Sequence, residues 1–457
     1  LTPFVAFSDN ERILQLIILM IILRTVKNIS SLNIAASVLL FLAAILAAVV
    51  ANSSLSPVYQ DFLLQELHLR IGNFNLFSHG GHPLKMIEFI NDCLMTVFFL
   101  AVGLEIKREL LVGELSSVRK AALPFIAACG GMVVPVVIYA LSVASGTPET
   151  RGMAIPMATD IAFSLGVLSL LGKRVPLSLK IFLTAFAVVD DIGGILVIAL
   201  FYSADVAYGY LIAAAVLYVF LYYMGKFGVT QKIFFLFFGV IIWYLFLQSG
   251  IHSTISGVIL AFVIPARPRL DAGKYIERIR DIIGEFPVSK SDNIVLTNAQ
   301  IATLKQVERA SDYVISPLQS LEDNLHGAVS FVILPLFAFA NAGVVFSGSG
   351  SIVGDVSIAV AAGLLLGKFL GIYLFTWLAV KSGVALMPAG MNWKNIAGVS
   401  LLGGIGFTVS LFIANLSFAD EYPELLNQAK FGVLVGTVLA GVLGYVVLNW
   451  VLPEREK

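Results

Sequence analysis

Two adjacent aspartates, Asp190 and Asp191, lie in the middle of an apolar run that extends from Ile181 to Phe201. A membrane-crossing helix needs about 20 apolar residues, so both carboxylates would lie near the centre of the bilayer. An ionised side chain there costs about 2.5–3.5 kcal/mol on insertion scales, and such groups usually belong to an ion or proton pathway. The pair therefore predicts a site for cations or protons. A buried pair that is merely satisfied by polar neighbours is the less favoured interpretation.

Adjacent residues on an α-helix are separated by about 100° of rotation, so Asp190 and Asp191 cannot point in one direction. We expect one carboxylate to bind the cation. The other would exchange a proton while pairing with a lysine.

Three further features place polar or helix-breaking residues in apolar segments. They are the run from Pro156 to Ser164 with Thr159 and Asp160, the run from Gly403 to Ser410 with Thr408, and the isolated Lys368. Backbone groups freed by a helix break are tolerated at membrane depth only against protein or a water-filled cavity. Two interrupted spans in corresponding halves of a chain are the sequence sign of a transporter binding site.

Interrupted helices expose a partly positive N-terminus and a partly negative C-terminus inside the membrane. Asp160 and Lys368 are the residues available to offset these two fields. For Asp160, an offsetting role and direct ligation of a cation are both left open. For Lys368, a structural salt bridge and a proton-carrying role are both left open, because buried lysines change their protonation readily.

The composition excludes several classes of protein. Of the 457 residues, 58% are hydrophobic and only 13% are charged, whereas soluble domains carry about 25% charged residues. The formal net charge is zero, which gives no indication of a nucleic-acid partner. The two cysteines, Cys93 and Cys129, form neither a disulfide framework nor a metal-binding spacing.

Hydropathy predicts an all-α polytopic membrane protein with about twelve transmembrane helices. The expected spans are 34–52, 86–104, 121–145, 153–170, 177–202, 206–224, 231–248, 251–264, 328–347, 356–379, 396–416 and 430–451. The connections on one side would hold Lys107, Arg108, Arg119, Lys120, Lys173, Arg174, Lys180, Lys226, Lys232, Lys381 and Lys394. The other side would hold only Arg70, Lys85, Arg151 and Lys430. The positive-inside rule then predicts that both termini are cytoplasmic.

The spans divide the chain into five regions. An extension over residues 1–32 is interpreted as interfacial or partly inserted, and residues 33–265 hold the first eight spans. Residues 266–327 are expected to form a cytoplasmic insertion with one or two surface helices, because the spacing over Thr297–Leu325 is helix-like. We interpret this insertion as a solvated connector. Residues 328–451 hold the last four spans, and residues 452–457 form a cytoplasmic tail.

With these features the chain resembles the NhaA family of sodium–proton antiporters over about residues 33–451. The motifs that carry the resemblance are Asn91-Asp92, Phe98–Leu110, Ala158–Phe163, Asp190-Asp191, Ser249–His252, Leu334–Gly343, Gly367-Lys368 and Gly404–Thr408. The resemblance implies an inverted-repeat antiporter fold, with repeats at about 121–202 and 356–451. It also implies that the spans holding Asp160 and Gly404 are interrupted and cross at the midplane.

The resemblance further implies a secondary transporter of the bacterial inner membrane. Sodium or lithium would leave the cytoplasm while protons enter, with electrogenic stoichiometry and a role in pH homeostasis. By the matching motifs, Asp191 is the principal Na⁺ ligand, Asp190 is its partner, Lys368 pairs with Asp190 in one state, and Thr159 and Asp160 lie beside the site. The residues implied in the pH response are Glu105, Arg108, Glu109, His252 and Glu322.

Expected partners are the lipid bilayer, monovalent cations and protons, without nucleic acid, and a homodimer is left open. No cofactor is expected beyond the transported ions, and the protein is not expected to be an enzyme. A passive cation channel is the alternative function, and an intramembrane aspartyl protease is less favoured. From the residues alone, His252 is more readily a packing residue than a pH sensor, and His79-Gly-Gly-His82 indicates a solvated loop rather than a metal site.

Overall fold

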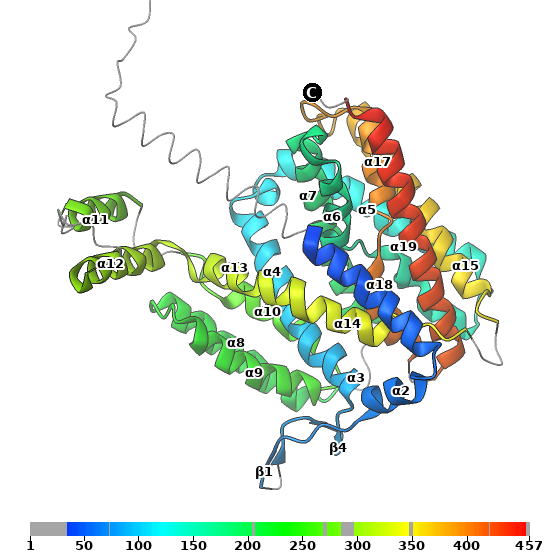
Figure 1. Cartoon of the computed structure of the whole chain (residues 1–457), viewed down its shortest axis with the longest axis horizontal. Coiled ribbons are helices and arrows are strands. Elements are labelled where there is room, and N and C mark those ends of the chain that lie inside the picture. Colours follow the sequence, from blue (N-terminus) through cyan, green and yellow to red (C-terminus); the bar gives the residue numbers. More distant parts are fainter. Residues whose placement is uncertain are drawn as a thin grey trace, which may run out of the picture. The chain divides into compact units, whose positions relative to one another are not determined.

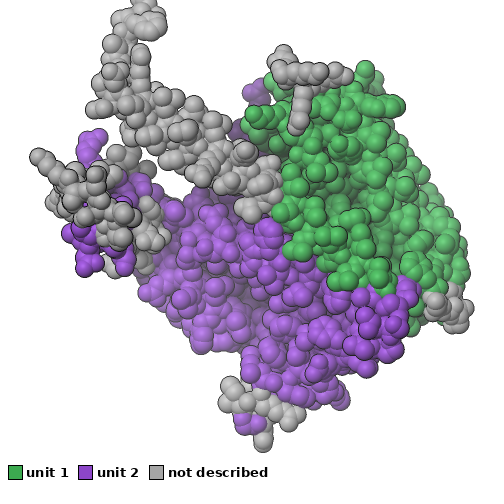
Figure 2. All heavy atoms as spheres, viewed as in Figure 1, with its two compact units in different colours: residues 1–49, 123–187, 341–457 green, residues 50–122, 188–340 purple. Residues whose placement is uncertain are grey.

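The computed structural model describes residues 34–72, 74–202, 206–267, 272–284, 297–346, 351–419 and 421–453. The predicted extension over residues 1–32 and most of the predicted tail lie outside these residues. Within the described part, helices dominate, and strands occur only as two short hairpins. The chain forms two compact units, which Figure 2 shows in green and purple. Unit 1 comprises residues 1–49, 123–187 and 341–457, and unit 2 comprises residues 50–122 and 188–340.

Unit 1 contains most of the helix Ile34–Ala51, followed after residue 122 by most of α5 and by the first part of α7. The helices of this unit are α5 (Val118–Ser142), η3 (Pro148–Met157), α6 (Ile161–Leu170), η4 (Gly172–Arg174), α7 (Leu177–Phe201), α15 (Asp355–Ala362), η6 (Gly363–Gly367), α16 (Lys368–Lys381), α17 (Trp393–Leu402), α18 (Phe407–Phe418) and α19 (Pro423–Val451). The long helix α19 packs against both α15 and α17. Close packing is possible because Gly432 and Gly444 of α19 lie directly on Ser357 and Leu402.

Unit 2 contains the rest of α7 and the elements between residues 50 and 340. Its helices are α2 (Ser56–Leu64), α3 (Met86–Phe89), η1 (Ile90–Leu94), α4 (Met95–Leu111), η2 (Glu114–Ser116), α8 (Tyr208–Lys226), α9 (Lys232–Leu247), α10 (Thr254–Val263), α11 (Ala272–Gly284), α12 (Asn298–Val314), α13 (Pro317–Ala328), η5 (Val329–Ile333) and α14 (Leu334–Asn341). Helices α4, α8, α9, α10 and α13 share one hydrophobic core, which includes Leu104, Leu221, Phe235, Leu260 and Leu318.

The hairpins of unit 2 are formed by β1 (Arg70–Ile71) with β2 (Phe74–Asn75) and by β3 (Ser78–His79) with β4 (His82–Pro83). His79 pairs with His82 across a turn of two glycines, Gly80 and Gly81. Their φ angles of 56° and 85° lie in the left-handed region that glycine adopts readily. The segment is therefore a hairpin turn, and its four residues are exposed.

The predicted polytopic membrane architecture is confirmed. Among the described residues, eight helices are long and apolar enough to cross a bilayer, and counting two bent helix pairs as single spans gives ten. Two shorter apolar helices, Lys232–Leu247 and Thr254–Val263, coincide with the remaining predicted spans. The expected number of twelve is reached only if these two short helices are counted as spans.

The segment Thr297–Leu325, for which the sequence predicts one or two surface helices, forms α12 and the first part of α13. Ser316 caps α13 by accepting a hydrogen bond from the Gln319 backbone N–H. Pro317 occupies the first turn of α13, where the missing N–H costs nothing. Helix α13 then continues through a π-helical turn into α14, so that Pro317–Asn341 is one membrane-length helix. The predicted boundary between residues 327 and 328 falls inside this helix.

Candidate functional site

Two bent helix pairs in unit 1 are broken at the positions that the sequence predicts. The axes of η3 and α6 differ by 45°, and those of α17 and α18 differ by 44°. Pro156 precedes the first break, and Ala158 and Asp160 have extended backbone there. The second break contains Gly404, which has no room for a side chain because the Leu364 carbonyl oxygen lies against it.

Each break supplies hydrogen-bond partners to the other. The Asp160 backbone N–H donates to the Ile405 carbonyl at 2.7 Å, and the Thr159 hydroxyl donates to the Gly403 carbonyl at 2.8 Å. The Ser410 hydroxyl donates to the Ile155 carbonyl at 2.7 Å. Because helix breaks free backbone groups that lipid cannot satisfy, these bonds make the two interrupted helices interdependent. The two breaks therefore lie against each other within this unit.

The Asp160 carboxylate binds the N-termini of two helices. Its Oδ1 accepts a hydrogen bond from the Phe163 N–H of α6 at 3.0 Å. Its Oδ2 accepts hydrogen bonds from the Thr408 N–H at 3.1 Å and the Thr408 hydroxyl at 2.6 Å, at the start of α18. A carboxylate in this position caps free N–H groups and offsets the positive ends of both helices. This geometry accounts for an acidic residue here without a bound cation, and direct ligation stays a prediction.

Lys368 is fully buried at the start of α16, directly after the π-helical turn η6. Its neighbours Leu364 and Ile372, each about one turn away, lie against Gly404 and Gly403 of the second break. Residues four apart share a helix face, so Lys368 lies on the face of its helix that is turned toward this break. The close approach of this helix to α5 depends on Gly367, where a Cβ would lie 2.6 Å from Pro135 Cα.

Asp190 and Asp191 lie in the middle of α7, with 0% and 5% of their surfaces exposed. They belong to unit 2, whereas Thr159, Asp160 and Lys368 belong to unit 1. Asp191 shares a helix face with Ile195 and Ile198. These two residues line a narrow crevice together with Phe99 of α4 and with Thr254, Ile255 and Val258 in the first half of α10.

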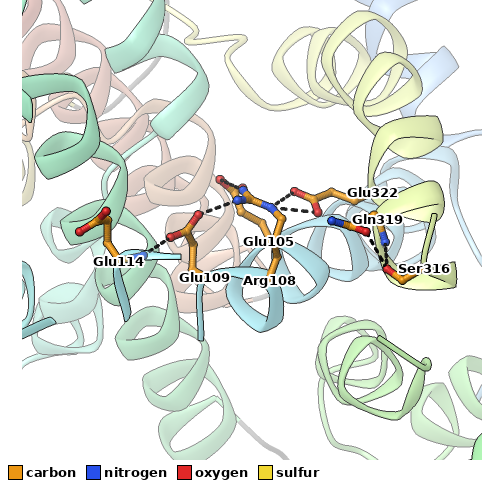
Figure 3. Close-up of polar contacts among 7 residues, drawn as sticks. All are labelled: Glu105, Arg108, Glu109, Glu114, Ser316, Gln319 and Glu322. Atoms are coloured by element: carbon orange, nitrogen blue, oxygen red, sulfur yellow. Dashed lines mark hydrogen bonds and ion pairs between the residues drawn. The ribbon is translucent and has the colours of Figure 1, made fainter. Parts of the chain in front are cut away.

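Four of the five predicted pH-response residues form one cluster in unit 2, shown in Figure 3. Arg108 Nε donates to both Glu322 oxygens at 2.9 and 3.1 Å, and Arg108 Nη1 donates to Glu109 Oε1 at 2.7 Å. Glu105 Oε1 lies 4.0 Å from Arg108 Nη2. The second Glu109 oxygen accepts a hydrogen bond from the Glu114 backbone N–H at 3.0 Å. One arginine thus connects three carboxylates of α4 and α13.

His252 lies apart from this cluster, two residues before the start of α10. Its Nδ1 is 3.8 Å from Asp92 Oδ1 and 3.3 Å from the Thr254 hydroxyl. The five predicted residues thus lie in two groups.

Sequence reasoning missed two sets of polar contacts. The hydroxyls of Ser164 and Ser410 connect the two helix breaks. The one sequence signal for these contacts is that each serine lies about one turn from a predicted break. Lys107, which we expected to lie in a cytoplasmic connection, is part of α4 and binds carbonyl groups at the end of α10. Because Lys107 lies between the charged residues Glu105 and Glu109, nothing in the sequence indicates that its partner is the end of another helix.

Comparison with known proteins agrees with the resemblance noted from the motifs. Residues 27–448 match the family described as Na+/H+ antiporter 1. The chain belongs to this family. The Na(+)/H(+) antiporter NhaA of Bacteroides thetaiotaomicron is 74% identical over 96% of this chain and 100% of the relative. The proteins of the same name from Parabacteroides distasonis and Porphyromonas gingivalis strain ATCC 33277 are 50% and 47% identical, over 95% and 94% of this chain and 98% and 96% of the relatives.

The Na+/H+ antiporter 1 family is a family of transporters and not of enzymes. The predicted family and the all-α membrane fold are therefore confirmed. The protease and passive-channel alternatives are not favoured by this membership.

Proposed function

We propose that the chain exports Na⁺ or Li⁺ in exchange for protons, as a pH-regulated and electrogenic secondary transporter of the bacterial inner membrane. Relatives that cover nearly the whole chain are named Na(+)/H(+) antiporters. The structural observation that carries the proposal is the pair Asp190 and Asp191, two almost fully buried carboxylates in the middle of a helix of membrane-spanning length. Intramembrane acids of this kind are functional by default.

Exchange follows from competition between two cations for the same oxygens. Burial favours a protonated carboxyl group, whereas a neighbouring cation favours the ionised form. Sodium is a hard cation that prefers carboxylate, carbonyl, hydroxyl and water oxygens, by the same logic as other hard ions. Asp191 would be the principal ligand and Asp190 its partner, with Lys368 pairing with Asp190 in one state. Two protons carried by these groups against one sodium ion would move net charge.

The crossing of the two interrupted helices supports the transport step. Thr159 and Asp160 lie where the breaks meet, and their hydrogen bonds satisfy backbone groups that would otherwise need water. Alternating access in transporters of this architecture is a rocking of one bundle against the other around a fixed site. The crossing would then stay intact while access to the carboxylates changes.

The cluster around Arg108 supports the proposed pH response. Glu105, Glu109 and Glu322 compete for one guanidinium, so a change in the protonation of any of them redistributes its ion pairs. These pairs connect α4 with α13, which continues into a membrane-length helix. His252 would respond through a different contact, with Asp92.

Exchange is tested in everted membrane vesicles that contain an internal pH-sensitive dye. Adding Na⁺ or Li⁺ to acid-loaded vesicles should release protons and restore the fluorescence, across a series of pH values. A passive channel would carry Na⁺ current without proton counterflow. The variant Asp190→Asn should reduce or abolish the signal, while Asp61→Asn, which changes an exposed aspartate of α2, should not.

The orientation and assembly are parts of the same proposal. Both termini would lie in the cytoplasm, with the insertion before Pro317 on the same side, and no cofactor would be required beyond the transported ions. Labelling of cysteines introduced at the termini, from either side of the membrane, tests the orientation. Cross-linking at low protein concentration tests whether two copies associate as a homodimer.

A further inference from the structure

Helix α10 is too short to cross a bilayer by itself, because its ten residues extend only about 15 Å. It packs along α4, and the two helices run parallel in the same unit. Contact is close because Gly257 of α10 lies directly on the Thr96 carbonyl oxygen of α4. Gly103 of α4 repeats this arrangement, since a Cβ there would lie 2.8 Å from Ala261 Cβ. The position of α10 is therefore set mainly by α4.

The carboxyl end of α10 is bound by a lysine of α4. Lys107 Nζ donates to the carbonyl groups of Ala261 at 3.3 Å and Phe262 at 2.7 Å, and also to that of Ile264. The last carbonyl groups of a helix have no intrahelical partner, and they carry the negative end of the helix dipole. A lysine ammonium group satisfies both requirements at once.

The amino end of α10 is bound by an acidic residue of the same membrane-spanning helix. The hydroxyl of Ser253, the residue before α10, donates to Asp92 Oδ1 at 3.2 Å and to the Asp92 carbonyl at 3.3 Å. The Trp243 indole N–H also donates to this carbonyl, at 3.2 Å. A carboxylate near a helix N-terminus is favourable, as a cation is near a C-terminus. The membrane-length helix Met86–Leu111 thus carries an acidic residue beside the amino end of α10 and a basic residue beside its carboxyl end.

The first half of α10 lines a crevice that α7 also lines. Thr254 and Val258 line the crevice that Ile195 and Ile198 of α7 also line. These α7 residues continue the helix face that carries Asp191. A shift of α10 along α4 would therefore move the wall beside this face.

We propose that Lys107 is a positioning residue for cation binding, which acts by fixing the carboxyl end of α10 and thereby the place of Thr254 and Val258 beside the Asp191 face of α7. The proposal rests on the proposed antiport. Lys107 itself does not touch the transported ion in this arrangement. Its effect would pass through α10, which it holds together with Asp92.

The test compares Lys107→Met, which removes the charge, with Lys107→Arg, which retains a cationic hydrogen-bond donor. Everted vesicles give the KM for Na⁺ and the maximal exchange rate at one fixed pH. For Lys107→Met we expect the KM to rise about 2- to 30-fold, the range of a cation at a helix end. The maximal rate should change less than the KM, because the lost interaction affects binding. Lys107→Arg should restore most of the wild-type KM.

A matched control is Lys226→Met in α8, because this lysine lies over the ring of Tyr222 in its own helix. It should leave the KM unchanged. A second measurement, hydrogen–deuterium exchange of the purified protein, does not depend on transport. Lys107→Met should increase exchange at the carboxyl end of α10 but not in α8.

The outcomes separate the two proposals. If the wild-type protein exchanges no Na⁺ for protons, the proposed function fails, and hydrogen–deuterium exchange still decides whether Lys107 fixes α10. If Lys107→Met changes neither the KM nor the exchange of α10 amides, the positioning role is overturned. If this variant does not accumulate, Ser253→Ala decides, because loss of the hydroxyl at the amino end should raise the KM in the same direction. An unchanged KM in that variant overturns the proposal.

Discussion

Asp160 and Thr408 form a two-bond contact between the two interrupted helices, in which one carboxylate oxygen accepts from both the backbone N–H and the hydroxyl of the threonine. The other carboxylate oxygen caps α6. This contact joins the starts of two half-helices that are far apart in the sequence. Several properties of the protein should depend on it and on the groups around it.

The substitution Thr408→Val should destabilise the folded protein by about 1.5–3 kcal/mol, the usual contribution of a hydrogen bond to a charged group. The backbone N–H of residue 408 remains, so one of the two bonds is kept. Thermal unfolding of the purified protein in detergent measures the effect. Thr408→Ser retains the hydroxyl and should be much closer to the wild type. Equal stability of the valine and serine variants would contradict the assignment.

Asp191→Asn should abolish Na⁺-driven proton movement while the protein still inserts into the membrane. The amide has nearly the shape of the carboxyl group but carries no negative charge to bind Na⁺ and no exchangeable carboxyl proton. Dye-loaded everted vesicles, normalised to the amount of inserted protein, give the measurement. Retained exchange at the wild-type rate would falsify the role of Asp191 as principal ligand.

Lys368→Ala should weaken folding stability, coupling, or both. Truncation of a large buried side chain leaves a cavity and commonly costs about 2–5 kcal/mol. Thermal unfolding gives the first effect, and the pH profile of exchange gives the second. A variant with unchanged unfolding temperature and unchanged pH profile would count against any role for this lysine.

Gly404→Ala should destabilise the protein by about 1–3 kcal/mol or more, because the added methyl group has no space beside the Leu364 carbonyl oxygen. Gly441→Ala in α19 is the matched control. A Cβ there makes only ordinary contact with Ile405, at 3.6 Å. Unfolding temperatures that fall equally in both variants would show that the contact at the second break is not the cause.

Gly113→Ala should shift the pH profile of exchange by about half a unit or more, which corresponds to about 0.7 kcal/mol or more. The new methyl group would overlap the Glu109 carboxylate and displace it from Arg108. Gly327→Ala in α13 tests for general effects of an added methyl group, because nothing lies near a Cβ at that position. If the two variants had the same pH profile, Glu109 would have no role in the pH response.

The sequence predicted the parts of this structure that depend on local chemistry. Apolar runs located the membrane helices, and Pro156 and the glycines around Gly404 located both helix breaks. The sequence left open whether one or two helices follow Thr297, because the polar first turns of α13 resemble the surface helix that precedes Pro317. The partners of Lys107 and Thr408 could not be predicted, since they depend on contacts between segments more than 150 and 240 residues apart. Periodicity gives the direction of a side chain, but not what lies opposite.

The distance in sequence between the two helix breaks also has a consequence for biosynthesis. Asp160 leaves the ribosome 248 residues before Thr408, an interval of roughly 12–50 s at typical rates of translation. During this time the first interrupted helix lies in the membrane without the hydrogen bonds that the second interrupted helix provides in the complete protein. A nascent chain that stops before Trp393 should therefore be recognised by membrane quality control, and should be cleaved by proteases near Ala158 that spare the completed protein.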